Sequence, residues 1–224
     1  MRKTTNGTTM LSRILRLING KIALSFSYQT EDIVALDLAL KAGAKDIEIF
    51  ALDTLKHFRE CLEYHKAVES FYGVKIKRYK PNRSSLDGLE QKLGEFGMRE
   101  SLENRRECCH IRKVEPLGRA LRGKAAWITG LRAAQSATRS AIQIVEFDEK
   151  YALFKINPIA SWSEREVFDY IARNNLPINS LYNRGFRSVG CAPCTRAVQE
   201  GEDIRAGRWW WENPEHKECG LHIK

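Results

Sequence analysis

Two pairs of cysteines are the residues in this sequence best suited to hold an inorganic centre. Cys108 and Cys109 are adjacent, and Cys191 and Cys194 form a Cys-x-x-Cys pair. Six cysteines could instead form three disulfides, but that framework is typical of short secreted chains, and this chain has 224 residues. We therefore expect the four paired thiols to bind a metal ion or an iron–sulfur cluster.

The adjacency of Cys108 and Cys109 favours a cluster over zinc. Structural zinc sites usually place about two to four residues between paired cysteines, so that the backbone can fold around the metal. Neighbouring side chains diverge by about 100° on a helix and about 180° on a strand, and a cluster with several irons accepts ligands from diverging directions. A zinc site and four reduced thiols without a metal remain alternatives.

A fifth cysteine, Cys219, lies near the end of the chain, beyond a segment rich in arginine and tryptophan. Nearby cations lower the pKa of a thiol, so Cys219 is a candidate nucleophile, with an unreactive tail thiol as the alternative. No periodic pattern predicts burial of Trp209, Trp210 and Trp211. We expect these side chains to be exposed, either to cover a pocket or to stack on single-stranded nucleic acid. Cys61 is predicted to be an ordinary buried helix cysteine.

The composition is that of a globular protein with an excess of positive charge. The net charge is +9, which is compatible with a solvated basic surface, with nucleic acid, or with a small anionic substrate. No apolar run approaches the roughly 18 residues of a membrane span. The basic start leads into no secretion signal. These features favour a cytoplasmic protein without a membrane partner.

Strand and helix patterns alternate over the first half of the chain. This alternation predicts an α/β fold, in which helices cover both faces of a mostly parallel sheet. The predicted strands span residues 21–24, 46–52, 74–79 and 125–129. The predicted helices span residues 31–41, 56–70, 85–96 and 101–121, the last with a break near Pro116.

Polar residues that follow three of these strands are expected to share one edge of the sheet. In parallel sheets, ligands bind beyond the carboxyl ends of the strands. The three segments are Ser25-Phe26-Ser27, Asp53-Thr54 and Thr129-Gly130, the last continuing to Arg132. Hydroxyls, backbone N–H groups and a helix N-terminus could hold a phosphate at the first segment, although such turns are often simple connections.

The remaining chain is predicted to surround this sheet in three parts. Residues 1–20 form a basic lead-in helix, residues 21–199 form the domain that binds nucleotide and metal, and residues 200–224 form a mobile segment. Within the domain, residues 142–147 and 151–156 pair as a hairpin. Ser163 and Glu166 form a capping box for a further helix.

Several motifs occur together in the second half of the chain. They are the two cysteine pairs, residues 112–117 (RKVEPL), 129–132 (TGLR), 205–212 (RAGRWWWE) and 218–222 (ECGLH). In combination they closely resemble assimilatory adenylyl-sulfate (APS) reductases, the cluster-bearing branch of the APS/PAPS reductase family. The resemblance extends from about Lys21 to His222. It implies an adenine nucleotide α-hydrolase-like (PP-loop) fold, a [4Fe-4S] cluster, and reduction of APS to sulfite and AMP in sulfate assimilation.

The resemblance also implies roles for individual residues. Cys219 would attack the sulfur of APS to form an S-sulfocysteine, which thioredoxin or a glutaredoxin-like reductant would resolve. Lys113, Arg205 and Arg208 would act with Cys219 on the anionic substrate. The implied cluster ligands are Cys108, Cys109, Cys191 and Cys194. The implied substrate-binding residues are Ser25, Phe26, Ser27, Leu52, Thr54, Gly130, Arg132 and His222.

Two loops depart from the usual pattern of this family. The first reads SFSYQTED (residues 25–32), one residue longer than the common form and without its glycine, and the second reads LDTLKHF (residues 52–58), where the family usually has Gly and Arg after Thr. PAPS as substrate, alone or beside APS, remains an alternative. A nucleic-acid-binding or tRNA-modifying protein with a four-cysteine metal site is a further one, although the charge is already explained by an anionic substrate. Whether the protein forms a homo-oligomer stays open.

Overall fold

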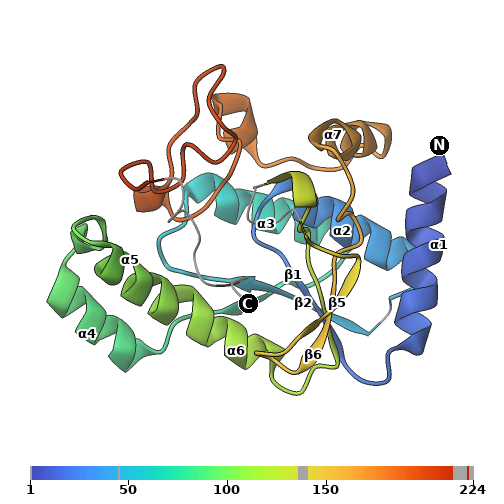
Figure 1. Ribbon diagram of the computed structural model, residues 1–224, viewed down its shortest axis with the longest axis horizontal. Coiled ribbons are helices and arrows are strands. Elements are labelled where there is room, and N and C mark those ends of the chain that lie inside the picture. The colour runs from blue at the N-terminus through green and yellow to red at the C-terminus, as the bar shows by residue number, and fades with distance from the viewer. Residues whose placement is uncertain (1, 45, 136–140, 214–220, 222–224) are drawn as a thin grey trace.

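A six-stranded sheet forms the centre of the protein, with the strand order β3-β2-β1-β4-β6-β5 (Figure 1). The computed structural model describes residues 2–44, 46–135, 141–213 and 221. The strands are β1 (Ile22–Ser25), β2 (Ile47–Leu52), β3 (Lys77–Tyr79), β4 (Ala126–Ile128), β5 (Val145–Asp148) and β6 (Leu153–Ile156). Neighbouring strands are parallel except β5 and β6, which form the predicted antiparallel hairpin. The predicted mostly parallel sheet is therefore confirmed.

Helices cover both faces of the sheet (Figure 1). On one face α2 (Thr30–Lys41), α3 (Arg59–Tyr72) and α7 (Glu164–Arg173) contribute to the larger core, and α1 (Arg2–Leu17) packs against α2. On the other face, Leu117 and Leu121 of α6 (Glu115–Leu121) meet Phe50 and Trp127 of the sheet. The remaining helices are α4 (Arg83–Leu93) and α5 (Leu102–Cys109).

Helix α2 is the most deeply buried helix of the fold. Ile33, Val34, Leu36 and Leu38 are all fully buried, because the sheet, α1 and α7 enclose the helix on several sides. Burying one such aliphatic side chain stabilises a fold by about 1.5–3 kcal/mol. This packing fixes the N-terminus of α2, and with it the loop between β1 and α2.

The predicted break at Pro116 is wrong. The backbone stays helical from α5 through to α6, and Pro116 lies in the first turn of α6, where a missing backbone N–H costs little. The irregularity is instead a π-helical segment, His110–Val114, marked by a hydrogen bond from the N–H of Glu115 to the carbonyl of His110. Such π segments are frequent at functional sites, and this one directly follows Cys109 and contains Lys113.

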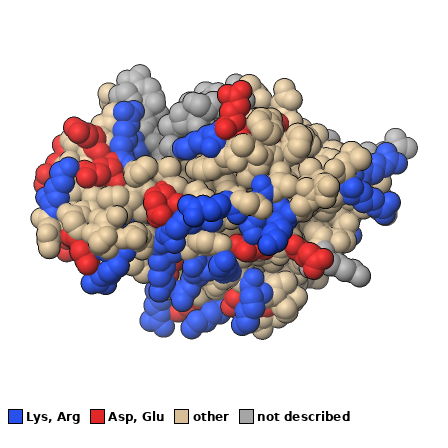
Figure 2. Space-filling view, turned by 90° about the horizontal axis from the view of Figure 1, so that it is seen from below, with Lys and Arg blue, Asp and Glu red and all other residues tan. Residues whose placement is uncertain are grey.

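Positive charge gathers on the face that lies beneath the sheet in Figure 1. The space-filling view from below shows Lys and Arg side chains in a broad group with Asp and Glu among them (Figure 2). Ion pairs neutralise some of the protein's cations: Lys77 and Lys124 both lie within 3.6 Å of Glu48, and Arg119 pairs with Glu115. Part of the net charge of +9 therefore belongs to a solvated, partly paired surface.

Two local predictions hold. The side chain of Ser163 caps the N–H of Glu166, and the Glu166 carboxylate accepts from the Ser163 N–H, so the capping box that opens α7 is confirmed. Cys61 is fully buried in α3, as expected of a structural cysteine. Within the part of the chain that the structure covers, no helix is both long and apolar enough to cross a membrane.

Candidate active site

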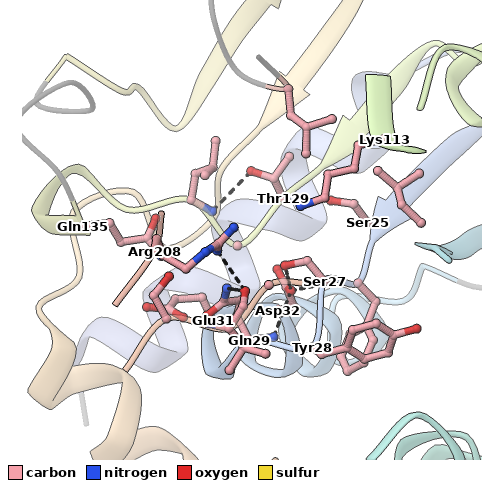
Figure 3. A pocket seen from close by; sticks show the side chains of 18 of the residues that line it. Ser25, Ser27, Tyr28, Gln29, Glu31, Asp32, Lys113, Thr129, Gln135 and Arg208 are labelled. Carbon is pink, nitrogen blue, oxygen red and sulfur yellow. Dashed lines mark hydrogen bonds between the residues drawn. The ribbon is translucent and has the colours of Figure 1, made fainter. Parts of the chain in front are cut away.

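A pocket opens where the loops after β1, β2 and β4 meet (Figure 3). Residues of all three loops line it: Ser25, Phe26, Ser27, Leu52, Thr54, Thr129 and Gly130. The predicted common edge at the carboxyl ends of the strands is therefore present. Asp53 is the exception, because it is absent from the lining and its carboxylate lies 3.4 Å from the guanidinium of Arg78.

Tyr28 takes the place of the missing glycine in the first loop. Its φ of 69° lies in the left-handed region, which glycine adopts without strain and a tyrosine adopts only at a cost. The buried ring offsets that cost by packing edge-on against Phe26 at 5.6 Å and His57 at 4.9 Å. His57 belongs to the second unusual loop, so the two departures from the family pattern contact each other.

Asp32 holds the first loop together through hydrogen bonds to Ser27. Its carboxylate accepts hydrogen bonds from both the backbone N–H and the hydroxyl of Ser27, each at 2.6 Å (Figure 3). Burial raises the pKa of Asp32 to about 6, although the bonds from Ser27 oppose that rise. In this structure the donors of Ser27 are directed at Asp32, which differs from the direct phosphate contact expected from the sequence. Ser27 therefore shapes the loop, whereas Ser25 lines the pocket without being drawn into that network.

Gly130 allows the β4 loop to lie against the start of α2. A Cβ atom at Gly130 would lie 2.7 Å from Oδ1 of Asp32 and 2.8 Å from the carbonyl carbon of Glu31. These distances are too short for non-bonded atoms, and the backbone of α2 cannot move aside, since the helix is held by the core. The contact explains why glycine is needed here.

Gly130→Ala is expected to separate the β4 loop from α2. We expect the free energy of unfolding to fall by about 1–3 kcal/mol and the affinity for adenine nucleotide to fall as well. Urea denaturation and AMP titration measure the two effects. Gly88→Ala in α4 is the matched control, because a Cβ there meets no atom within 4 Å. Equal behaviour of the two variants would contradict the contact described here.

Cations from distant parts of the chain converge on the pocket. Lys113 of the π-helical segment and Arg208 of the late segment line it (Figure 3), and so does Arg205. The structure thus brings together three of the predicted catalytic residues. Sequence reasoning missed Arg187, which also lines the pocket and whose only signal was its charge in an irregular segment.

Arg132 does not line the pocket, which corrects the expectation that it contacts the substrate. Its guanidinium is 1% exposed and donates to Oε1 of Glu31 at 2.7 and 3.1 Å and to the carbonyl of Trp162 at 3.2 Å. The charge is neutralised inside the protein, so it is not directed at a ligand. Arg132 instead ties the β4 loop to the N-terminal turn of α2.

The four paired cysteines line a second, smaller cavity next to the pocket. Cys108 and Cys109 end α5, Cys191 precedes the 3-10 turn Ala192–Cys194 that Cys194 ends, and each is at most 9% exposed. None of the five described cysteines forms a disulfide. Among the described residues, no group of three or more His, Cys, Asp or Glu side chains is arranged to hold a single metal ion.

The surroundings of the thiols are suited to an anionic group. The Nε atoms of Arg112 and Arg208 and the Nε1 atom of Trp209 are buried N–H donors that find no acceptor within the described structure. Burial acts to raise the pKa of Cys191, but Lys113, a hydrogen bond to Thr54, Arg208 and Arg112 outweigh it and lower that pKa. Burial raises the pKa of Cys194 to about 11. Four thiols beside unused N–H donors fit a cluster with four thiolate ligands, whose sulfur atoms accept hydrogen bonds.

Lys113 and Trp209 line both cavities and so separate the cysteines from the pocket. Lys113 belongs to the π-helical segment that directly follows Cys109. Thr54 provides a further link, since its hydroxyl accepts from the Cys191 thiol at 3.3 Å and it also lines the pocket.

The expected exposure of the three tryptophans is wrong for Trp209, which is 1% exposed. Guanidinium groups of Arg105 and Arg208 lie 4.7 and 4.5 Å from its ring centre, and its indole packs against the cysteines. Glu212 fixes Arg105 through two hydrogen bonds of 2.7 and 2.9 Å. Arg105 lies 107 positions from Glu212 in sequence, so no local pattern could predict this contact. Trp209 is therefore not available to stack on nucleic acid bases, whereas Trp210 is 37% exposed, as expected.

Two predicted site residues, Cys219 and His222, lie outside the described residues. Leu221, which stands between them in the ECGLH motif, lines the pocket. The late segment described up to residue 213 is attached to the cysteine region, because Arg208 pairs with Thr195 in an isolated β-bridge and the N–H of Trp209 donates to the carbonyl of Cys194. The boundary and mobility of residues 200–224 stay predictions.

Comparison with known proteins identifies the family. A sequence model of the phosphoadenosine phosphosulfate reductase domain matches residues 21–197. The chain belongs to the phosphoadenosine phosphosulfate reductase family. Adenosine 5'-phosphosulfate reductase of Allochromatium vinosum is 46% identical over 213 residues, which cover 95% of this chain and 82% of the relative. The resemblance inferred from the motifs is thereby confirmed.

Two solved structures superpose on this chain, one of a reductase and one of a protein that shares only the fold. A phosphoadenylyl-sulfate reductase from Candida auris, crystallised as a phosphate complex, superposes with a TM-score of 0.71 at 27% identity and covers 85% of this chain and 90% of its own. FMN adenylyltransferase of Candida glabrata superposes with a TM-score of 0.60 at 15% identity, covering 97% and 73% of the two chains. The similarity to the adenylyltransferase concerns the fold alone. Together, the two superpositions confirm the predicted PP-loop α/β fold.

Proposed function

We propose that this protein is an adenylyl-sulfate reductase that converts APS to sulfite and AMP in sulfate assimilation. The observation that carries the proposal is the junction of two cavities. A pocket on which four cations converge adjoins a cavity with four cysteines, and Lys113 and Trp209 line both. The relatives named adenosine 5'-phosphosulfate reductase support APS as the substrate.

The proposed first half-reaction takes place at Cys219. Its thiolate attacks the sulfur of APS, the bond between sulfur and the phosphate oxygen breaks, and AMP leaves with the electron pair of that bond. Two anions approach one another in this step, and their repulsion amounts to several kcal/mol at an effective dielectric constant of about 20. Lys113, Arg205 and Arg208 carry the charge that offsets this repulsion and stabilises the departing phosphate.

The second half-reaction needs an external dithiol. The five other cysteines are buried and four of them belong to the second cavity, so we assign resolution of the S-sulfocysteine to thioredoxin or a glutaredoxin-like protein. A thiolate of the partner attacks the sulfur of Cys219, sulfite leaves, and the second partner thiol closes the partner's disulfide. The partner thus supplies both electrons that reduce the sulfate sulfur. We place the reaction in the cytoplasm, where the cysteines stay reduced.

We assign Cys108, Cys109, Cys191 and Cys194 as ligands of a [4Fe-4S] cluster. The burial of the four thiols and the unused N–H donors of Arg112 and Trp209 support this assignment. Because the dithiol provides the electrons, a bound cluster would contribute its field and the fixed position of Lys113 rather than electron transfer. The chain's own part is to keep these residues together through the α5 helix and the Cys-x-x-Cys turn.

A labelling experiment tests the proposed nucleophile. Purified protein incubated with ³⁵S-labelled APS and no reductant is expected to retain label on the wild type and on Cys61→Ala, and to lose it on Cys219→Ser. Addition of reduced thioredoxin should release the label as sulfite. Equal labelling of Cys219→Ser and wild type would reject the mechanism.

PAPS is the second candidate substrate. The phosphoadenylyl-sulfate reductase from Candida auris, which shares the fold at 27% identity, favours it. Rates of sulfite release with APS and PAPS, measured on the same preparation, decide between the two. A rate with PAPS at least equal to that with APS would replace the proposed substrate and keep the chemistry.

A further inference from the structure

The side chain of Gln29 joins the first loop of the pocket to the segment that leads to Cys191. Its Nε2 donates to the carbonyl of Val189 at 2.6 Å, and its Oε1 accepts from the N–H of Val189 at 3.3 Å. The amide thus pairs with both backbone groups of one residue, which also settles which end carries the nitrogen. Oε1 accepts a further bond from the Tyr182 hydroxyl at 3.1 Å.

The same Val189 carbonyl holds Arg208. Nη1 of Arg208 donates to it at 3.1 Å, so one oxygen accepts from the first loop and from a cation of the pocket. The guanidinium lies directly against the next residue, because a Cβ at Gly190 would come within 2.4 Å of its Nη2. Arg208 is 6% exposed and stacks on Trp209. The backbone at Val189 and Gly190 therefore determines where this charge points.

Neither contact follows from the family motifs, since Gln29 stands in the segment where this chain departs from the usual loop. Tyr28 adopts the left-handed conformation there, whereas Gln29 has an ordinary φ of −87° and serves as the N-cap of α2. From this position its side chain reaches the backbone of Val189. A residue without an amide side chain at position 29 would lack the connection.

We propose that Gln29 is a positioning residue that sets the direction of the Arg208 guanidinium through the Val189 carbonyl. This inference rests on the proposed function, since it concerns the cation expected to meet the anionic end of APS. Loss of the Gln29 amide would free the Val189–Gly190 backbone from the first loop and leave Arg208 without a fixed partner. Ordering the guanidinium would then have to occur on binding, which lowers the affinity for APS.

Equilibrium binding tests the inference without turnover. In a Cys219→Ser background, which cannot react, Gln29→Met is expected to weaken APS binding about tenfold, equivalent to about 1.4 kcal/mol. Gln91→Met, the same substitution at an exposed position of α4, is the control and should leave the dissociation constant unchanged. Unchanged APS binding by Gln29→Met would overturn the inference.

A double-mutant cycle distinguishes positioning from a purely structural role. If Gln29 acts through Arg208, adding Gln29→Met to Arg208→Met should weaken APS binding by less than about twofold beyond Arg208→Met alone. A full additional tenfold loss would overturn the inference. Should Gln29→Met fail to fold, Gln29→Asn serves in the cycle, since it keeps an amide that is one methylene too short to reach Val189 and Tyr182 together. Failure of the Cys219→Ser parent to bind APS would reject the proposed function itself.

Discussion

Replacing Lys113 with methionine is expected to lower the rate of enzyme labelling by APS about 10²–10³-fold, the usual effect of removing one group that stabilises developing charge. Lys113 lines both the pocket and the cysteine cavity, so its ammonium group is placed to act on the charge that moves from sulfur to phosphate. Methionine retains the length and the packing of the side chain. Single-turnover labelling with ³⁵S-labelled APS measures the rate of the first half-reaction alone.

The control for this prediction is Lys66→Met, at an exposed position of α3. It removes the same charge from the protein and should leave the labelling rate unchanged. The free energy of unfolding and the iron content of Lys113→Met should match those of the wild type. A slow variant that has also lost its iron would mean that Lys113 maintains the metal site, and an unchanged rate would remove it from the mechanism.

Arg132→Met is expected to lower the free energy of unfolding by about 3–5 kcal/mol, because it leaves the buried carboxylate of Glu31 without its partner. Arg132 is 1% exposed and pairs with Glu31 at 2.7 Å, and the Glu31 side chain is 9% exposed. Urea denaturation measures the loss. Arg165→Met, which breaks an exposed contact with Asp169 in α7, should change stability by less than about 1 kcal/mol.

The double variant Glu31→Gln with Arg132→Met identifies the cause. Removing both charges should recover most of the stability lost in Arg132→Met, since no buried charge then remains uncompensated. A stable Arg132→Met that fails to bind APS would instead restore the role implied by the sequence resemblance, in which this arginine contacts the substrate.

The secondary structure was predictable wherever its cause is local. The short apolar run of β1, the alternation of Ile47, Ile49 and Ala51 in β2, and the capping box of Ser163 and Glu166 all act within a few residues. The largest error, the break assigned to Pro116, arose because proline was treated as a helix breaker without regard to its position. In the first turn of α6 it needs no partner for its nitrogen, and the irregularity is the π-helical segment that precedes it.

The site was predictable in its members but not in their contacts. Parallel strands bring their carboxyl ends to one edge, so the three loops could be placed together from the sequence. The family motifs then added Lys113, Arg205 and Arg208, which the structure brings to the same pocket. Arg132 bears the same charge, yet it is neutralised inside the protein, because Glu31 faces it from α2.

The sequence by itself therefore determined the α/β order of the chain, the edge of the sheet where ligands bind, and the residue types that can hold a cluster and act on an anionic sulfate. Only the tertiary structure decided which of these side chains face the pocket. Arg132 meets Glu31 across 101 positions of sequence, Arg105 meets Glu212 across 107, and Gln29 meets Val189 across 160. Periodicity and capping extend over a few residues, whereas pairing over such separations depends on the path of the whole chain, and that path determines whether a charge is directed at a ligand or neutralised within the protein.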